Sequence, residues 1–230
     1  MPILWILCDI EGTTTSLAFV QEVLFPISYK KLPEFLAKKE NWDLFSSEFH
    51  SLAAHGIDTR NIESLTSYFR ELMDKDVKDP LLKKIQGKIW KAAYENKEIR
   101  GHVYDDVLPA WERWQRMGKK IGIYSSGSVE AQQLLFRYSE KGDLTRWISA
   151  YFDTGIGPKK DTSSYQRIST KLNCQPQEIL FLSDSVEELE AAKKAHLAVA
   201  RILRPGVEER QSLNIPQLKK FDEIDSLFLT

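Results

Sequence analysis

The sequence is poor in cysteine, with only Cys8 and Cys174 among 230 residues. Two cysteines provide neither a disulfide framework nor a CxxC metal pair, which is typical of proteins in a reducing compartment. The four histidines show no metal-ligand spacing, and they are His50, His55, His102 and His196. Cys8 lies inside an apolar run, so we expect it to serve packing.

The sequence also has no long hydrophobic run and no excess of one charge. No stretch approaches the ~18 to 20 apolar residues of a membrane span. The apolar start lacks a basic segment and soon meets Asp9, so a signal peptide is not expected. Lys and Arg (32) nearly balance Asp and Glu (33), which leaves no global field to recruit nucleic acid or anionic lipid. We therefore expect a cytoplasmic protein without nucleic-acid or membrane partners, and the balanced charge favours a monomer.

Strand-like and helix-like segments alternate from Gly101 onward, which is typical of βαβ units and a parallel sheet. The expected strands are Lys120–Tyr124, Ala150–Phe152, Ile179–Ser183 and Ala198–Ile202. The expected helices are Asp105–Met117, Ser128–Tyr138, Asp161–Leu172 and Ser185–Ala195. The apolar segment Ile3–Cys8 has the same buried character and is expected to join the same sheet.

Between Ser16 and Arg100 the apolar residues recur at helical spacing instead, as in Leu65, Phe69 and Leu72. Asn61 is a candidate cap for one of these helices, and Asp79-Pro80 is a candidate start for the next. The sequence thus predicts an α/β fold, a doubly wound parallel sheet with an inserted all-helical domain. The core domain would comprise residues 1–15 and 101–230, and the helical insert residues 16–100.

Polar chemistry follows several of the expected strands. Ligands of such sheets bind beyond the carboxyl ends of the strands, and the residues found there include Asp9, Glu11, Ser125, Ser126, Lys159 and Asp184. Carboxylates, hydroxyls and a cation are what is needed to hold a phosphate together with an oxygen-ligated Mg²⁺. The sequence therefore predicts a phosphate and magnesium site at this edge.

Each residue also has a purely structural interpretation. Ser128 is a good helix N-cap, Ser185 and Glu188 form a capping-box pattern, and Lys160 is expected to be solvated. The site hypothesis depends on the observation that polar residues follow several of the expected strands in the same chain. The chain contains neither the phosphate-binding motif GxxxxGK[ST] nor a GxSxG nucleophile elbow.

The chain order of Asp9, Ser125, Lys159 and Asp184 resembles that of the haloacid dehalogenase superfamily of phosphatases, whose cap domain often occupies the first gap. Glu11 takes the place of the second aspartate. The segments DIEGTTT, YSSGSVEAQ, FDTGIGPK and IQGKIW together resemble the acireductone synthase (enolase-phosphatase) family of methionine salvage. The resemblance covers the whole chain and is weakest between Trp42 and Met73.

This resemblance implies a substrate, 2,3-diketo-5-methylthiopentyl-1-phosphate, which is enolised and then dephosphorylated to an acireductone. It implies that Asp9 is the nucleophile and Glu11 the acid/base. Ser125 and Ser126 would bind substrate, and Lys159 would orient the phosphate. The partner expected is accordingly a small phosphorylated diketone.

The resemblance also implies one Mg²⁺ per chain, held by Asp9, the main-chain oxygen of Glu11 and Asp184. Glu188 would be an acid that supports this site without binding the metal ion directly. An alternative activity is phosphatase action on another small phosphomonoester. A non-enzymatic alternative is a signalling receiver phosphorylated on Asp9, but such a domain is shorter and has no helical insert.

Overall fold

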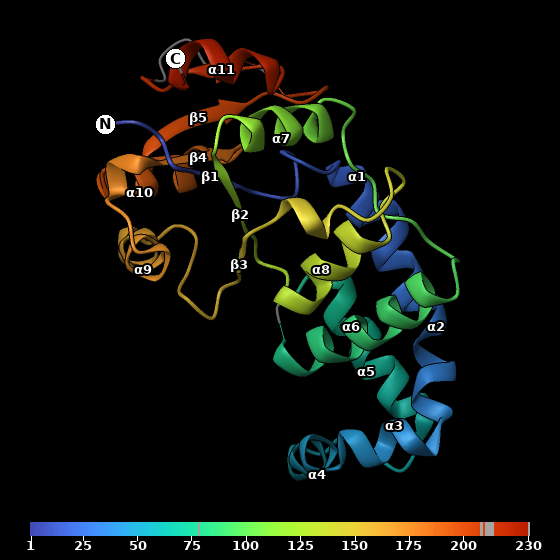
Figure 1. Ribbon diagram of the computed structural model, residues 1–230. Helices are drawn as coiled ribbons and strands as arrows, with labels where there is room; N and C mark the ends of the chain where they lie inside the picture. The colour runs from blue at the N-terminus through green and yellow to red at the C-terminus, as the bar shows by residue number, and fades with distance from the viewer. Residues whose placement is uncertain (78, 208, 210–213, 230) are drawn as a thin grey trace. The chain divides into compact units, whose positions relative to one another are not determined.

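The computed structural model describes residues 1–77, 79–207, 209 and 214–229 (Figure 1). It divides into two compact units, one formed by residues 1–17 and 100–230 and the other by residues 18–99. Among the described residues, no helix combines the length and apolar character needed to cross a bilayer. The assignment of a core and a cap domain to particular residues remains a prediction.

The first unit contains a six-stranded parallel sheet with the order β3-β2-β1-β4-β5-β6. In the register, Leu7 of the central strand lies opposite Gly122 on one side and Phe181 on the other. The carboxyl ends of β1, β2 and β4 therefore meet at one edge. The strands are β1 (Trp5–Cys8), β2 (Lys120–Tyr124), β3 (Ala150–Phe152), β4 (Ile179–Ser183), β5 (Ala198–Ile202) and β6 (Gln217–Leu218).

The predicted parallel α/β sheet is confirmed. Its edge strand β6 is not among the strands expected from the sequence. β6 is only two residues long and carries no β-branched run, so no pattern in the sequence signals it. The helices of this unit are α7 (Val107–Arg116), α8 (Val129–Arg137), α9 (Thr162–Leu172), α10 (Val186–Lys194) and α11 (Asp222–Phe228). Of these, α11 was also not predicted.

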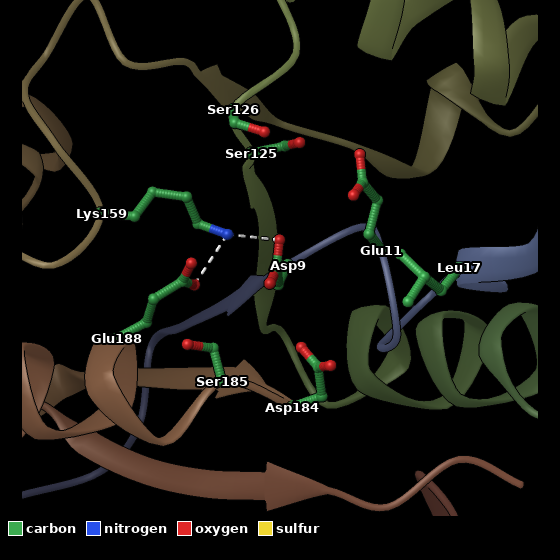
Figure 2. A pocket seen from close by; sticks show the side chains of 9 residues that line it. All are labelled: Asp9, Glu11, Leu17, Ser125, Ser126, Lys159, Asp184, Ser185 and Glu188. Carbon is green, nitrogen blue, oxygen red and sulfur yellow. Dashed lines mark hydrogen bonds and ion pairs between the residues drawn. The ribbon is translucent and has the colours of Figure 1, made fainter. Parts of the chain in front are cut away.

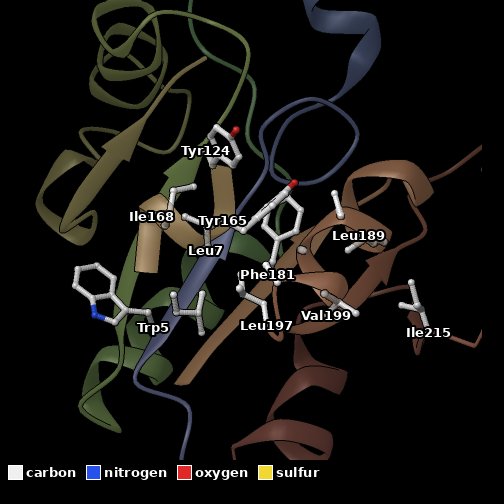
Figure 3. Close-up of a cluster of buried hydrophobic side chains, with 14 residues drawn as sticks. Trp5, Leu7, Tyr124, Tyr165, Ile168, Phe181, Leu189, Leu197, Val199 and Ile215 are labelled. Atoms are coloured by element: carbon white, nitrogen blue, oxygen red, sulfur yellow. The ribbon is translucent and has the colours of Figure 1, made fainter. Parts of the chain in front are cut away.

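One face of the sheet packs against α9 and α10 in a hydrophobic cluster (Figure 3). Leu7 and Phe181 supply the strand side of this cluster, and Tyr165 of α9 and Leu189 of α10 the helix side; all four side chains are fully buried. Cys8 points to the opposite face by the alternation of strand side chains and is also fully buried. Burial raises the pKa of its thiol, as befits a packing residue.

In the second unit, residues 18–99, helices are the only regular secondary structure among the described residues, and turns or irregular segments connect them. Its own core includes Leu32, Leu65, Phe69 and Ile85, none of which is exposed to solvent. The helices are α2 (Phe25–Ala37), α3 (Lys39–Leu44), α4 (Ser46–Ala54), α5 (Ile62–Asp74) and α6 (Pro80–Glu95), preceded by α1 (Leu17–Phe19) and a π-helical turn, Val20–Leu24.

Two caps in this unit follow the sequence prediction. The Asn61 side chain accepts hydrogen bonds from the backbone N–H groups of Glu63 and Ser64 at the start of α5. The Asp79 side chain accepts one from Leu82 at the start of α6, whose first residue is Pro80. Both side chains satisfy helix N–H groups that lack a partner within the helix.

Candidate active site

Asp9 follows β1 directly and is almost completely buried at the carboxyl edge of the sheet, with 4% of its surface exposed. The chain then turns back tightly, because the N–H groups of Thr13, Thr14 and Thr15 all donate to the carbonyl oxygen of Ile10. Ile10 N–H donates to Asp9 Oδ1 at 2.7 Å. The turn thus fixes the orientation of the carboxylate that precedes it.

Gly12 is required at the tip of this turn. Its φ of +69° lies in the left-handed region. A Cβ placed on Gly12 would lie 2.4 Å from Asp184 Oδ2, so the carboxylate of Asp184 approaches the backbone of the turn closely. The glycine after the two acids therefore allows the ends of β1 and β4 to bring their carboxylates together.

A pocket opens at this edge of the sheet (Figure 2). It brings together every site residue predicted from the sequence, and Leu17 and Ser185 also line it. The full lining comprises Asp9, Glu11, Leu17, Ser125, Ser126, Lys159, Asp184, Ser185 and Glu188. In the view of Figure 2, Lys159 and Glu11 lie on opposite sides of Asp9. Their chemical roles remain predictions.

Lys159 is the one cation among the described residues that line the pocket. Its ammonium lies 2.6 Å from Asp9 Oδ1 and 2.7 Å from Glu188 Oε2. Burial by itself would lower the pKa of Lys159, but the carboxylates of Asp9 and Glu188 outweigh it and raise the pKa above its ordinary value. Lys159 is therefore charged at physiological pH.

Ser183 is a site residue that the sequence analysis missed. Its fully buried hydroxyl lies 3.0 Å from Asp9 Oδ2 and 3.2 Å from Glu188 Oε2, and it accepts a hydrogen bond from Ser185 N–H. A hydroxyl has a single proton, so it can donate to only one of these carboxylates at a time. The only sequence signal was a polar residue ending an otherwise apolar strand.

The capping-box interpretation of Ser185 and Glu188 is wrong. The Ser185 side chain makes no capping hydrogen bond to α10, and its hydroxyl instead donates to Glu187. Glu188 turns toward Lys159 and Ser183. The countercharge offered by Lys159 outweighs a local cap, which is typically worth only ~1 kcal/mol.

The pocket holds more negative than positive charge, since four carboxylates and one ammonium line it. Burial, and then the charge of Asp9, raise the pKa of Asp184 to about 6. The same two causes raise the pKa of Glu188. Such an arrangement favours binding of a further cation.

The donor set is compatible with magnesium. Within the described ranges, no group of three or more His, Cys, Asp and Glu side chains is arranged to hold a metal by itself. The predicted set has only two side-chain ligands, Asp9 and Asp184, together with a main-chain oxygen. Mg²⁺ is commonly bound by one or two carboxylates and completed by water and phosphate oxygens, so this smaller set fits it.

The serines after β2 are held by the neighbouring strand. Ser125 is 3% exposed, and its N–H donates to the carbonyl oxygen of Phe152 in β3. The Gln132 amide donates to the carbonyl oxygens of both Gly127 and Phe152 at 2.8 Å, a clamp that sequence reasoning did not identify. Ser128 caps α8 through Ala131 N–H, as predicted. The loop with Ser125 and Ser126 is thereby fixed to the sheet.

Comparisons with known proteins agree with one another. Residues 3–196 match the family model of haloacid dehalogenase-like hydrolases. The chain is 43% identical to "Enolase-phosphatase E1" of Yersinia enterocolitica, covering 96% of each chain, and 40% identical to the protein of the same name in Sorangium cellulosum, covering 97% of this chain and 98% of that one.

Solved structures show the same similarity. The crystal structure of the UTR4 protein from Saccharomyces cerevisiae superposes with a TM-score of 0.81 at 35% identity, covering 96% of this chain and 99% of that one. A haloacid-dehalogenase-type phosphatase from Thermococcus onnurineus superposes with a TM-score of 0.63 at 21% identity, covering 99% and 97%, which is a likeness of fold alone.

Proposed function

Because the chain belongs to the enolase-phosphatase E1 family of the haloacid dehalogenase-like hydrolases, we propose that it enolises and dephosphorylates a 2,3-diketo-1-phosphate. This membership confirms the family resemblance noted in the sequence. The proposed substrate is 2,3-diketo-5-methylthiopentyl-1-phosphate of methionine salvage, and the products are an acireductone and inorganic phosphate. The observation that carries the proposal is the buried Asp9 at the sheet edge, paired with Lys159 in a pocket lined by Glu11 and Asp184.

Asp9 is the proposed nucleophile. Its carboxylate is oriented by Ile10 N–H and the Lys159 ammonium on Oδ1, with the Ser183 hydroxyl at Oδ2. Attack would form a bond from a carboxylate oxygen to phosphorus while the bond from phosphorus to the enol oxygen breaks. Lys159 would neutralise charge growing on the phosphoryl oxygens, and Ser125 and Ser126, which follow the neighbouring strand β2, would bind the substrate.

Glu11 is the proposed acid and base. It would first give its proton to the leaving enol oxygen and then take a proton from the water that hydrolyses the aspartyl-phosphate. One acid must therefore be ionised and the other protonated in the same step, which explains two acids placed two positions apart. For the proton transfer during enolisation, Glu11 and Lys159 are both candidates.

Hydrolases of this kind generally depend on a metal, and we propose that this chain holds one Mg²⁺. The residues that would hold it are Asp9, Asp184 and the main-chain oxygen of Glu11, with Glu188 supporting the site through Lys159 and Ser183. When bound, the ion would supply Lewis-acid stabilisation of the phosphoryl oxygens. The excess of carboxylates in the pocket supports this assignment.

Variants at the two acids test these roles. We expect Asp9→Asn to abolish phosphate release, because an amide is a poor nucleophile, whereas Glu11→Gln should slow both half-reactions. Asp105→Asn is a matched control, since Asp105 is an exposed acid with its own lysine partner, Lys141. Appreciable turnover by Asp9→Asn would exclude Asp9 as the nucleophile, and a normal rate for Glu11→Gln would exclude its acid/base role.

We further propose domain boundaries, an oligomeric state and a cellular location for the protein. Residues 16–100 would form a cap domain on a core of residues 1–15 and 101–230. The protein would act as a monomer, and it would do so in the cytoplasm.

A further inference from the structure

The loop that carries Lys159 is held by side chains at four consecutive main-chain oxygens. It connects β3 to α9 and belongs to neither a helix nor a strand. The four hydrogen bonds run from Arg167 Nε to Ile156 O (2.6 Å), Tyr124 Oη to Gly157 O (2.8 Å), Ser164 Oγ to Pro158 O (2.8 Å) and Tyr165 Oη to Lys159 O (2.6 Å). Three of the four donors come from α9.

This loop needs such donors because its own backbone provides few. Pro158 has no N–H group, and the loop lies outside the described strands, whose pairing would otherwise satisfy its carbonyl oxygens. Of the four oxygens, Pro158 O also accepts a main-chain hydrogen bond, from Asp161 N–H at 3.0 Å. Gly157 has a φ of +142°, and a Cβ there would lie 2.2 Å from both Ser164 Oγ and Arg167 Nη2. The loop is therefore packed tightly onto the side chains of α9 that bind its oxygens.

The two tyrosines connect this loop to the hydrophobic core. Tyr124 and Tyr165 are fully buried, and their rings meet edge to face with centroids 5.6 Å apart. The Tyr165 ring also packs on Phe181 of β4 at 5.2 Å, and the Lys159 ammonium lies 5.8 Å from the Tyr124 ring centroid. Burial raises the pKa of both phenols, so their hydroxyls remain hydrogen-bond donors.

We propose that Tyr165 and Tyr124 are positioning residues that act through Lys159. By holding the main-chain oxygens of Lys159 and Gly157, their hydroxyls would place the lysine ammonium between Asp9 and Glu188. The inference rests on the proposed function, because it assumes that this ammonium meets the phosphate of a substrate. It extends the active site to two core residues that do not line the pocket.

Tyr165→Phe and Tyr124→Phe test the proposal, since each removes one hydroxyl and keeps the ring. We expect Tyr165→Phe to lower kcat for phosphate release by roughly 10- to 100-fold, as displaced catalytic groups typically do. Tyr124→Phe should act in the same direction. Tyr151→Phe is the matched control, because its hydroxyl is buried in the same unit and has no hydrogen-bond partner among the described residues. Its kcat should stay within about twofold of the unchanged protein.

A double-mutant cycle separates positioning from simple stabilisation. If Tyr165 acts through Lys159, then Tyr165→Phe should have no further effect on the residual rate once Lys159→Ala is present. A purely structural role would lower the rate by the same factor in both backgrounds. Equal losses in both backgrounds would overturn the proposal, and so would an unchanged kcat in folded Tyr165→Phe.

The failure of this inference can be distinguished from failure of the proposed function. The role of Lys159 can be measured with any phosphomonoester that the unchanged protein hydrolyses, by following phosphate release. If the diketone phosphate gives no enol product, only the substrate assignment is refuted. Calorimetric binding of inorganic phosphate in the presence of Mg²⁺ adds a readout without turnover. We expect Tyr165→Phe to weaken it several-fold relative to Tyr151→Phe, and equal affinities would contradict the positioning role.

Discussion

Replacing Lys159 with methionine should destabilise the protein as well as slow turnover. The Lys159 ammonium contacts Asp9 at 2.6 Å and Glu188 at 2.7 Å, and the side chains of these acids are only 6% and 12% exposed. Methionine retains the apolar stem but not the charge, so both carboxylates would lose their cation where water can replace it poorly. Lys159→Met thus isolates the electrostatic contribution of the lysine.

The size of the effect follows from the burial of the pair. Removing one partner of a buried ion pair costs about 3–5 kcal/mol of unfolding free energy, because the other charge is left uncompensated. For a chain of this size each kcal/mol shifts the Tm by roughly 2–4 °C. We therefore expect Lys159→Met to lower the Tm by roughly 6–20 °C.

Thermal unfolding followed by circular dichroism at neutral pH, with a chelator present to remove bound metal, measures this shift. Lys141→Met is the matched control, because the partner of Lys141 is Asp105, whose side chain is 93% exposed. An exposed ion pair contributes about 0–1 kcal/mol, so the control should lose at most a few degrees. A Lys159→Met variant that unfolds at the same temperature as the control would refute the reasoning.

Three other perturbations have defined outcomes. Gly12→Ala should reduce phosphate release at least tenfold, because the new Cβ would collide with the Asp184 carboxylate in a backbone conformation that disfavours alanine; a near-normal rate would contradict the tight approach of the two strand ends. Arg204→Lys should lower the unfolding free energy in urea by about 2–3 kcal/mol, because Arg204 Nη1 contacts both carboxylate oxygens of Asp106 while its Nε donates to Thr13 O, and an ammonium cannot make all three contacts. Treatment with a chelator should abolish phosphate release, and added Mg²⁺ should restore it; turnover that survives complete chelation would contradict the metal requirement.

Much of the sheet could be predicted because the side chains of its four central strands, β1, β2, β4 and β5, are almost all buried on both faces. Segments such as Lys120–Tyr124 and Ile179–Ser183 are short apolar runs between turn signals, and the structure places strands over these same residues. β6 is different, since its two residues gain their strand conformation only by pairing with Arg201 and Ile202. Local sequence carries no signal for such a pairing.

The gathering of the site residues was also predictable, because parallel strands end at a common edge. That rule indicated that Asp9, Ser125 and Asp184 would lie together, and they line one pocket. It could not indicate the contacts of Ser183 or the turn of Glu188 toward Lys159, since both depend on side-chain geometry between distant segments. The hydrogen bond from Tyr165 to the Lys159 carbonyl was hidden for the same reason.

The central claim is that one chain performs both enolisation and phosphate release. Anaerobic incubation of the purified protein with Mg²⁺ and a 2,3-diketo-1-phosphate tests it, with the ultraviolet band of the enol and the released phosphate followed together. We expect both signals in the unchanged protein and neither phosphate nor final enol product with Asp9→Asn. Phosphate without an enol, or cleavage of another phosphomonoester alone, would contradict the enolase-phosphatase assignment and leave only a phosphatase.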